Sequence, residues 1–556
     1  MKAPTTRTGR VTPFGDRALL VETADVAGAH ALAAVLGDAV AAAEVPDGVE
    51  EVVVGFASVL VVVDPRPDRA DPVDVADWLD TVASGAGRSV TAGGPGRSRS
   101  HVLPVVFDGV DLAEVAAAAG TSAGAVVDLL VAADLEVAFV GFAPGFPYLT
   151  GLPPELAALP RRPTPRTSVP AGSVAVAGGF ASVYPRSTPG GWHLLGRTGA
   201  VLFDPELPPH SRVAPGDRVR FVVADPDDLG PAVDHGRPLL DAGDGPCLDV
   251  LEPGLATTVQ DAGRRGVAHL GVPTGGAADG RAAASLHLLL GDDPDTTASL
   301  ECTAAGPTLR VVGDGHVAVV GPTAGAVDVT VDGRAAPTGT VLPVADGQVV
   351  RVGRVTAGLR AYLGVAGGIT TPVLFGSRSS DTLSGLGPGR LRVGDRLARG
   401  TPAGVRGRLD PSPVRRKGPV ALRVVAGPHG AADGLVGTIW TVGAEADRIG
   451  VRLSPGDGPG VRPGPSRPST PMMTGAVQVP PDGRPIVLLP DHATVGGYPV
   501  VACVSGVDLP LLGQLAPGDE VVFTEVGVAE AVGLGRRDRR ATAARVTGWF
   551  PTAAGT

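Results

Sequence analysis

The hydrophobic and polar residues of the first 84 positions alternate between strand and helix patterns. Ala18–Glu22 and Val49–Val63 are β-rich runs, and Gly55 inside the second run is typical of a hairpin or bulge. Between the two runs, Asp25 can cap a helix that reaches about Ala43. The apolar positions of this helix follow helical spacing: Val26, Ala29, Leu32 and Val35.

A second helix is expected after Asp71-Pro72, which resembles an N-cap followed by proline in the first turn. Apolar residues then recur at helical spacing: Val75, Trp78, Leu79 and Val82. The order strand, helix, strand, strand, helix predicts a ferredoxin-like α+β module, closed by a strand near Val102–Phe107. The Gly-, Ser- and Arg-rich stretch Gly85–Ser100 indicates a hinge or loop.

Short strands dominate the pattern beyond this module. Two helices are expected over Asp111–Ala118 and Ser122–Ala132, followed by a strand over Leu135–Phe142. From there to Val223, short β segments separated by Gly and Pro predict a barrel or sandwich. Ala224–Pro246 is acidic and rich in Pro and Gly, which is typical of an interdomain linker.

Three segments share a Gly-Asp turn that enters an alternating strand. They are Ala214–Phe221, Leu391–Leu397 and Ala516–Phe523. Pro-Gly-Asp, present in the first and third segments, is by itself a good turn before a strand, but three Gly-Asp turns at domain-like spacing favour repeated β-barrels. A second linker is expected over Gly404–Pro419, with the basic run Arg415–Lys417 near its end.

Composition narrows the class of protein. The 556 residues predict several domains, and a hydrophobic fraction of 44% is too high for a disordered chain. A net charge of −10 argues against a nucleic-acid partner. No apolar run is long enough to cross a bilayer and no signal peptide is visible, so we expect a cytoplasmic protein without a membrane partner. The widely spaced Cys247, Cys302 and Cys503 predict buried thiols.

The scarcity of lysine excludes several chemistries, because Lys2 and Lys417 are the only two in the chain. A Walker A loop needs a lysine after its glycines, and a Schiff base needs one in apolar surroundings. Biotin is normally attached within Ala-Met-Lys-Met, whereas Met472-Met473 is followed by Thr474, so we expect no covalent biotin on this chain. Neither a metal-binding histidine pair nor a serine-nucleophile motif is present, and no metal site is predicted.

The stretch Gly141–Thr198 concentrates aromatic rings among Gly and Pro residues. The rings belong to Phe142, Phe146, Tyr148, Phe180, Tyr184 and Trp192. Stiff loops that carry rings are typical of a pocket wall, and a turn-rich β domain whose rings fill its own core is the alternative.

Segments of this stretch resemble the KipI family, also called allophanate hydrolase subunit 1 or the B component of 5-oxoprolinase. They are Gly141–Tyr148, Pro165–Ser173 and Gly190–Arg197. The second half is similar to the KipA family, called allophanate hydrolase subunit 2 or the C component of 5-oxoprolinase. Its matching segments are Thr258–Arg264, Leu300-Glu301 with Gly306-Pro307, Tyr362–Ile369, Gly376–Asp381, Gly475–Pro480 and Gly496–Pro499. Long motifs in the right order over nearly the whole chain resemble a natural fusion of the B and C components, and the shared rings favour the pocket wall.

The resemblance implies a mainly β protein with an α+β part: cyclophilin-like β-barrel domains preceded by a small ferredoxin-like α+β domain. The implied division is a small α+β domain (1–98), a KipI-like barrel (99–224), a linker (225–246), a first KipA-like β domain (247–403), a linker (404–419) and a second KipA-like β domain (420–556).

The resemblance also implies an activity, the ATP-dependent opening of 5-oxoproline to glutamate. The expected co-substrate is ATP with Mg, and the expected partner is a separate 5-oxoprolinase A component of the LamB/YcsF type. A lactam is a poor electrophile. Phosphorylating its oxygen creates a good leaving group, so that water can attack the carbonyl carbon and the ring opens. Two alternatives remain: a urea carboxylase or urea amidolyase carboxyltransferase using biotin supplied in trans, and a KipI-like inhibitor of a histidine kinase.

The same resemblance indicates which residues form the site. The candidate catalytic residues are Asp261, Glu301, Arg378 and Asp381. The candidate substrate- or nucleotide-binding residues are Phe142, Pro144, Phe146, Tyr148, Arg166, Trp192, His193, Arg197, Gln260, Arg264, Gln478, Asp491, Gly496, Gly497 and Tyr498. Arginine suits phosphate and carboxylate groups, whereas the carboxylates could hold a metal, act as a base or orient the substrate.

Five positions depart from the family pattern. His193 and His492 each replace a residue that is usually arginine in the family. Phe180, His287 and Thr470 stand where Gln, Asn and Glu, respectively, are common. If these side chains bind substrate, they alter its identity.

Overall fold

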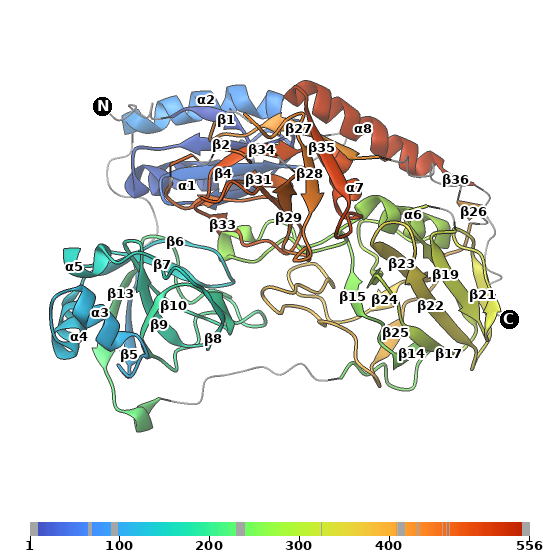
Figure 1. Ribbon diagram of the computed structural model, residues 1–556, viewed down its shortest axis with the longest axis horizontal. Helices are drawn as coiled ribbons and strands as arrows, with labels where there is room; N and C mark the ends of the chain where they lie inside the picture. Colours follow the sequence, from blue (N-terminus) through green and yellow to red (C-terminus); the bar gives the residue numbers. More distant parts are fainter. Residues whose placement is uncertain are drawn as a thin grey trace.

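The computed structural model describes residues 9–64, 69–89, 98–229, 239–323, 325–406, 408–409, 418–430, 433–456, 458, 460–462, 464–465 and 467–547. These residues form four units, mostly of β structure (Figure 1). The first and fourth units lie side by side at the top of the view, and the second and third lie below them at the left and right. Lys2, Lys417 and the basic run Arg415–Lys417 are outside the described residues.

The first unit is a four-stranded antiparallel sheet with two helices. Its elements are β1 (Val11–Pro13), β2 (Ala18–Glu22), α1 (Val26–Ala41), β3 (Val49–Val54), β4 (Ser58–Val63) and α2 (Pro72–Ser89), with sheet order β1-β2-β4-β3. Asp25 caps α1 by accepting a hydrogen bond from the Gly28 N–H at 2.8 Å. Asp71 accepts one from the Val73 N–H at 2.9 Å at the start of α2, so both predicted helix starts are confirmed.

The strand expected to close this sheet belongs elsewhere, so that part of the prediction is wrong. β5 (Ser100–Val105) pairs in parallel with β13 (Arg218–Val223) in the second unit, and β1 fills the edge beside β2. The hydrophobic pattern near Val102–Phe107 predicts a strand but not its partner. The partner is set by packing, because the register places Leu103 opposite Phe221 and buries both in the second unit's core.

The second unit is a seven-stranded sheet that closes almost completely into a barrel, with order β12-β9-β10-β7-β6-β13-β5 and a bridge from Val106 to Arg197. Besides β5 and β13 it contains α3 (Leu112–Ala118), α4 (Ala123–Ala132), β6 (Leu135–Val140), β7 (Pro147–Thr150), α5 (Pro154–Ala157), β8 (Arg166–Val169), β9 (Ser173–Ala177), β10 (Phe180–Val183), β11 (Thr188–Gly190) and β12 (His193–Arg197).

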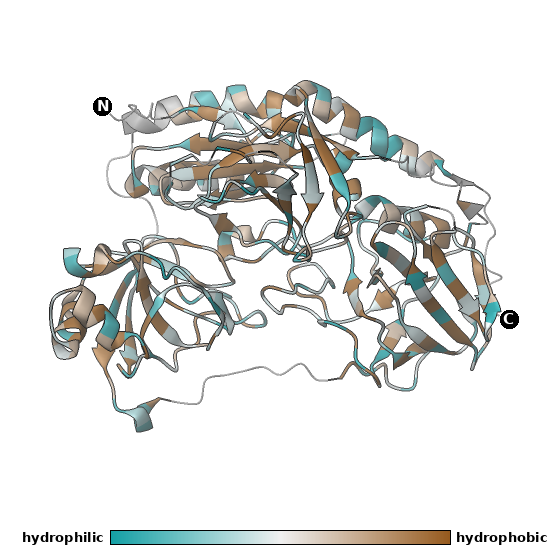
Figure 2. Cartoon of the chain, in the orientation of Figure 1, coloured by the Kyte–Doolittle hydropathy of each residue, from teal (hydrophilic) through white to brown (hydrophobic). Residues whose placement is uncertain are grey.

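The third unit packs a seven-stranded sheet on a five-stranded sheet, with apolar side chains of both in one core. Its elements are β14 (Cys247–Glu252), β15 (Ala256–Gln260), α6 (Gly280–Leu290), β16 (Ser299–Thr303), β17 (Thr308–Val312), β18 (Gly315–Val320), β19 (Val327–Val331), β20 (Arg334–Ala335), β21 (Leu342–Val344), β22 (Val349–Val355), β23 (Arg360–Val365), β24 (Ile369–Thr370) and β25 (Arg396–Arg399). Brown hydrophobic residues and teal hydrophilic ones share several of these strands in Figure 2.

The fourth unit is a closed barrel of order β27-β34-β31-β32-β29-β28-β35, covered by a long helix. Its elements are β27 (Val420–Ala426), β28 (Ile439–Val442), β29 (Gly450–Pro455), β30 (Thr470–Pro471), β31 (Ala476–Gln478), β32 (Ile486–Leu488), β33 (Val495–Gly496), β34 (Val500–Val504), α7 (Leu509–Leu512), β35 (Glu520–Glu525) and α8 (Val528–Ala544). The 3₁₀ turns are Pro226–Asp228, Ala268–Leu270 and Gly506–Asp508.

The predicted repeat corresponds to related strands in the second and fourth units. β35 pairs in parallel with β27, the first strand of its barrel, as β13 does with β5. β25 of the third unit instead pairs antiparallel with β14. The mainly β fold with an α+β part is confirmed.

The two expected linkers are described only in part. Residues 230–238 and 407 and 410–417 lie outside the described residues. At the end of the first linker, Leu240 donates its N–H to Asp395 of the third unit at 2.9 Å. Within the second, β26 (Arg408–Leu409) pairs with β36 (Val546–Thr547).

The three cysteines are buried and free, as predicted. Among the described helices, no single one is long and apolar enough to span a membrane, and α3 and α4 meet that test only jointly, as a pair bent by 88°.

Candidate functional site

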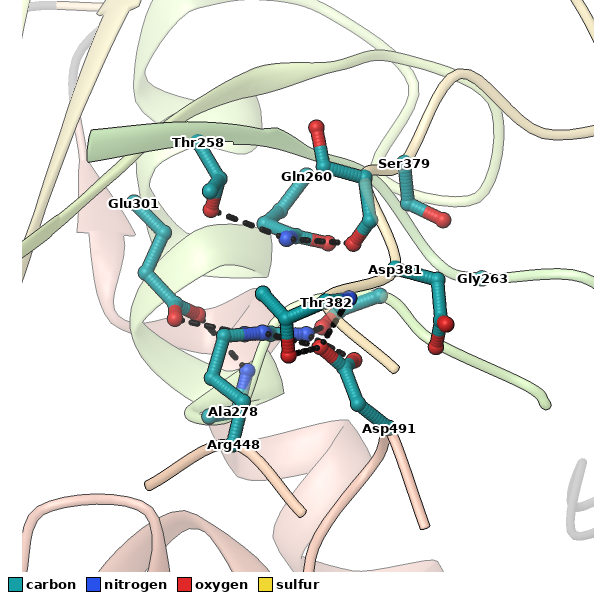
Figure 3. A network of polar contacts seen from close by, with 12 residues as sticks. Thr258, Gln260, Gly263, Ala278, Glu301, Ser379, Asp381, Thr382, Arg448 and Asp491 are labelled. Atoms are coloured by element: carbon teal, nitrogen blue, oxygen red, sulfur yellow. Dashed lines mark hydrogen bonds and ion pairs between the residues drawn. The ribbon is translucent and has the colours of Figure 1, made fainter. Parts of the chain in front are cut away.

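A buried network of charged side chains joins the third and fourth units (Figure 3). Arg448, just before β29, donates to both carboxylate oxygens of Asp491 at 3.0 and 2.8 Å. Its Nη1 donates to Oε1 of Glu301 on β16 at 2.5 Å. All three side chains are at most 7% exposed. We call Glu301, Arg360, Tyr362, Arg448 and Asp491 the buried ion-pair network.

Glu301 has its acceptor positions filled. Oε1 also accepts from Arg360 Nε at 3.2 Å, and Oε2 accepts from the Tyr362 hydroxyl at 2.7 Å and the Ala278 N–H at 2.8 Å. Burial alone would raise the pKa of Glu301, but the guanidinium groups of Arg448 and Arg360 hold it below its ordinary value. Glu301 is therefore a charged anchor between elements rather than a proton carrier.

Asp381, which is 1% exposed, contrasts with Glu301. Its Oδ1 accepts hydrogen bonds from the Ser384 N–H and hydroxyl, while Oδ2 has no partner among the described residues. Burial and then the nearby Asp491 carboxylate raise the pKa of Asp381 to about 7. Such a carboxyl can hold or release a proton near neutral pH, as a general acid or base must.

Asp261 ties two of the motif loops together. Its carboxylate accepts from the Gly263 N–H at 2.9 Å, the Ser377 hydroxyl at 2.7 Å and the Arg378 N–H at 2.6 Å. The adjacent Arg264 is 2% exposed and donates to the hydroxyl of Ser379 at 2.9 Å and to its carbonyl. Residues 258–264 and 376–381, far apart in sequence, thus form one polar loop pair.

Gln260 and Arg378 belong to the same loop pair. The Gln260 amide donates to the Thr258 hydroxyl at 2.9 Å and the Ser380 carbonyl at 3.0 Å, whereas its Oε1 has no partner among the described residues (Figure 3). The Arg378 guanidinium donates to the Thr371 carbonyl.

A cleft of about 560 Å³ opens beside this loop pair, between the first, third and fourth units. Asp261 lines it from the loop pair, Arg17 and Asp64 from the first unit, and Arg539 from α8. His287 of α6 also lines it and is 2% exposed. Burial lowers the pKa of His287 to about 4, so its ring is neutral at neutral pH.

The predicted aromatic residues form a separate cluster in the second unit. Phe146 packs edge-on against Tyr148, Tyr184 and Trp192, with ring centroids 5.1 to 5.5 Å apart. Most of these rings are buried; Phe142 and Phe180 are partly buried. The cluster also contacts Val495 of the fourth unit, so it faces the second half of the chain. It does not line the cleft.

The polar residues predicted in the second unit pair within it. Arg166 donates to Asp111 at 2.7 Å, Arg197 donates to Asp108 at 2.9 Å, and His193 contacts the Pro160 carbonyl at 3.0 Å.

The remaining predicted residues lie at the interface between the halves or in the fourth unit. Pro144 lies against Gly271 of the third unit. Gln478 donates to the Met472 sulfur at 3.3 Å beside Gly496, while Gly497 and the 43% exposed Tyr498 follow in the same loop. The structure therefore brings together Gln260, Asp261, Arg264, Glu301, Arg378, Asp381 and Asp491, but not the other predicted residues.

Sequence reasoning missed the two arginines that hold the network. Arg360 and Arg448 are 2% and 7% exposed. The sequence around an arginine in or beside a strand does not distinguish a buried side chain from a surface one. Tyr362 lies within one of the family-like segments, where no role was assigned to it. Among the described residues, no cluster of His, Cys, Asp and Glu is arranged to hold a metal ion.

Family models cover both halves of the chain. "Carboxyltransferase domain, subdomain C and D" matches residues 9–213, and "Carboxyltransferase domain, subdomain A and B" matches residues 270–525. A crystal structure of TTHA0988 has 34% sequence identity and a TM-score of 0.78, covering 92% of this chain and all of that one.

Curated relatives match one half each. The C component of 5-oxoprolinase from Escherichia coli K12 is 34% identical over 297 residues, covering 51% of this chain and 93% of the relative. The B component from Escherichia coli O157:H7 is 50% identical over 128 residues, 22% of this chain and 58% of the relative. Urea amidolyase of Saccharomyces cerevisiae is 30% identical over 307 residues, half of this chain but only 16% of the relative. The chain thus belongs to the family built from carboxyltransferase subdomains A to D, with parts homologous to the B and C components of 5-oxoprolinase joined in one polypeptide.

Proposed function

We propose that this chain is the fused B and C component of an ATP-dependent 5-oxoprolinase. With a separate A component of the LamB/YcsF type, it opens 5-oxoproline to glutamate through phosphorylation of the lactam oxygen. Homology of the two parts to the C and B components of 5-oxoprolinase supports this assignment.

The observation that carries the proposal is the composite cleft. Asp16, Arg17 and Asp64 line it from the part similar to the B component. Asp261 and His287 line it from the part similar to the C component. A cavity of about 560 Å³ is within the range that holds small ligands, and both parts are needed to form it.

The chemistry of the wall fits a lactam and a phosphate donor. Arginines that line the cleft are of the type that holds carboxylate and phosphate groups, and ATP with Mg is the co-substrate that the reaction requires. Asp261 presents a fixed carboxylate that can orient the substrate or its attacking water. Asp381, whose charge interacts with Arg264 and which does not itself line the cleft, supplies a carboxyl that exchanges protons near neutral pH.

The experiment combines the purified chain with its candidate A component and follows 5-oxoproline-dependent ATP hydrolysis. Asp261→Asn should lower this rate at least about a hundredfold, as expected for loss of a positioning or base carboxylate. Asp482→Asn is the matched control, because Asp482 is an exposed turn carboxylate that accepts the Arg484 N–H at 3.1 Å. An unchanged rate in Asp261→Asn would remove the cleft from the mechanism.

A second candidate is carboxyl transfer from biotin supplied in trans, favoured by the match to urea amidolyase over half of the chain. The same preparation, given N-carboxybiotin and urea, tests it. Transfer of the carboxyl group from N-carboxybiotin to urea, without 5-oxoproline-dependent ATP turnover, would establish this candidate and overturn the first.

A further inference from the structure

Five arginines line the composite cleft, and three of them, from different parts of the chain, have no carboxylate of the described residues within hydrogen-bond distance. Arg17 comes from the loop between β1 and β2, Arg265 from the third unit and Arg539 from α8. We call them the arginine cluster. They are separated by more than 200 residues in sequence, so only the folded arrangement of both halves brings them to one cavity.

Arg17 and Arg265 retain unused donor capacity. Arg17 donates one hydrogen bond to the Thr474 carbonyl at 3.0 Å, while its Nε is buried without a hydrogen-bond partner among the described residues and lies 3.9 Å from a carboxylate oxygen of Asp16. The carboxylates of Glu50 and Asp64 lie 3.6 and 3.7 Å from Arg265, beyond ordinary hydrogen-bond distance.

Arg539 lies near enough to both of these cations to interact with their charges. Burial, and then the like charges of Arg265 and Arg17, lower the pKa of Arg539, while Asp295 and Asp64 act in the opposite direction. Arg539 is exposed on α8, and within the described part of the chain it has no hydrogen bond or ion pair. Neighbouring guanidinium groups repel one another until an anion lies between them.

The other two arginines of the cleft and several of its carboxylates are engaged, whereas the exposed Asp295, among the described residues, interacts only through its charge with Arg539. Arg281 pairs with Asp538 at 3.0 Å and Arg536 with Asp71 at 3.4 Å. Asp16 accepts from the Ser505 hydroxyl and the Gly506 N–H, both at 2.9 Å. The carboxylates are thus mostly satisfied by protein donors, and the arginine cluster retains the free donors.

His287 gives a second, independent sign of a ligand. It lines the same cleft and is 2% exposed, and neither ring nitrogen has a hydrogen-bond partner among the described residues. A buried polar group without a partner is costly, which a bound ligand relieves. A neutral imidazole offers one donor and one acceptor, the complement of an amide's carbonyl and N–H.

We propose that the arginine cluster binds a small oxyanion, a carboxylate or a phosphate, in the composite cleft, with His287 hydrogen-bonding the ligand's polar neighbour group. Only one part of the inference rests on the proposed function, namely that the group bound by His287 is the amide of a lactam. The oxyanion site is a property of this chain without its partner protein.

Calorimetric titration of the full chain tests the proposal with three probes. The probes are 5-oxoproline, inorganic phosphate and 2-pyrrolidinone, which is the same lactam without its carboxylate. 5-Oxoproline should bind at least tenfold more tightly than 2-pyrrolidinone. Arg539→Gln should weaken 5-oxoproline and phosphate binding at least tenfold, as should Arg265→Gln. Arg540→Gln should bind as the wild type does, because Arg540, the next residue of α8 and exposed like Arg539, does not line the cleft.

The outcomes separate the anion source and the function. Phosphate binding without 5-oxoproline binding supports the oxyanion site and rejects the lactam as its ligand. Arginine-dependent binding without turnover beside the A component contradicts the proposed function and leaves the site standing. Absence of binding by both anions at millimolar concentration, or wild-type affinity in Arg539→Gln and Arg265→Gln, overturns the inference.

Discussion

Carboxylates close together in this molecule have different chemical environments. Glu301 accepts four hydrogen bonds, two of them from arginines, and stays charged. Asp381 bonds through one oxygen only and favours its protonated form up to about pH 7. Their sequence contexts predict that both belong to one site, but only the surrounding donors distinguish an anchor from a proton carrier.

Replacing Arg448 tests the anchoring role. Arg448→Met should cost about 3–5 kcal/mol of unfolding free energy, because it leaves Glu301 and Asp491 charged and buried without their shared partner. Urea unfolding measures the change. Arg452→Met, which removes an exposed pair with Glu445, is the control and should cost less than about 1 kcal/mol. Equal losses in both variants would contradict the anchoring role.

The raised pKa of Asp381 has a defined effect on stability. The folded chain holds a proton on Asp381 up to about pH 7, whereas the unfolded chain releases it near 3.8. The contribution of protonated Asp381 to folding stability is therefore complete below pH 4 and is lost as the pH rises through 7. Asp381→Asn should gain stability relative to the wild type between pH 4 and 7.5, by at least about 1 kcal/mol. A difference that stays constant across urea unfolding series at pH 5 and 7.5 would refute the shift.

At the scale of elements, local patterns predict which segments are helices and strands but not which strands pair. The caps at Asp25 and Asp71 are local, and both helices start where they predict. The partner of β5 depends on packing against β13, more than a hundred residues away, and the predicted partner is wrong for that reason. Motif resemblance identified the loop pair of Asp261, whereas Arg360 and Arg448 carry no local signal of burial.

A substitution at the contact between the second and third units tests how tightly these units pack. The Gly145 N–H donates to the Leu270 carbonyl at 2.8 Å, and Gly271, at φ +78°, lies so close that an added Cβ would be 2.3 Å from the Ala143 carbonyl oxygen. Gly271→Ala should cost more than about 2 kcal/mol from strain and overlap together. Gly178→Ala, at φ +56° with open space around it, isolates the strain and should cost about 1 kcal/mol. If thermal unfolding shows similar losses of stability in Gly271→Ala and Gly178→Ala, the contact between the units is loose.

At the scale of the whole molecule, the two halves interlock. The first unit shares a hydrophobic core with the fourth, in which Phe14, Leu20 and Leu60 pack with Met472 and Cys503. The two units lie side by side in Figure 1. Arg467 also pairs with Glu22 at 3.2 Å across this contact. The part similar to the B component is therefore joined to the part similar to the C component by packing as well as by the chain.

Cutting the chain tests whether packing alone holds the halves. A protease site placed between residues 229 and 239 should give two fragments that remain a 1:1 complex in gel filtration at micromolar concentration, because a core of this kind survives loss of one covalent connection. The uncut protein provides the elution reference. Separate elution of the fragments would show that the connection, rather than the interface, maintains the cleft.

The release of glutamate is the most direct measurement of the central claim. The wild-type chain, mixed with its candidate A component, 5-oxoproline and ATP with Mg, should form glutamate in proportion to the ATP hydrolysed. Omitting any one of these should stop the reaction. ATP hydrolysis that is indifferent to 5-oxoproline, or no glutamate with any matched A component, would contradict the account.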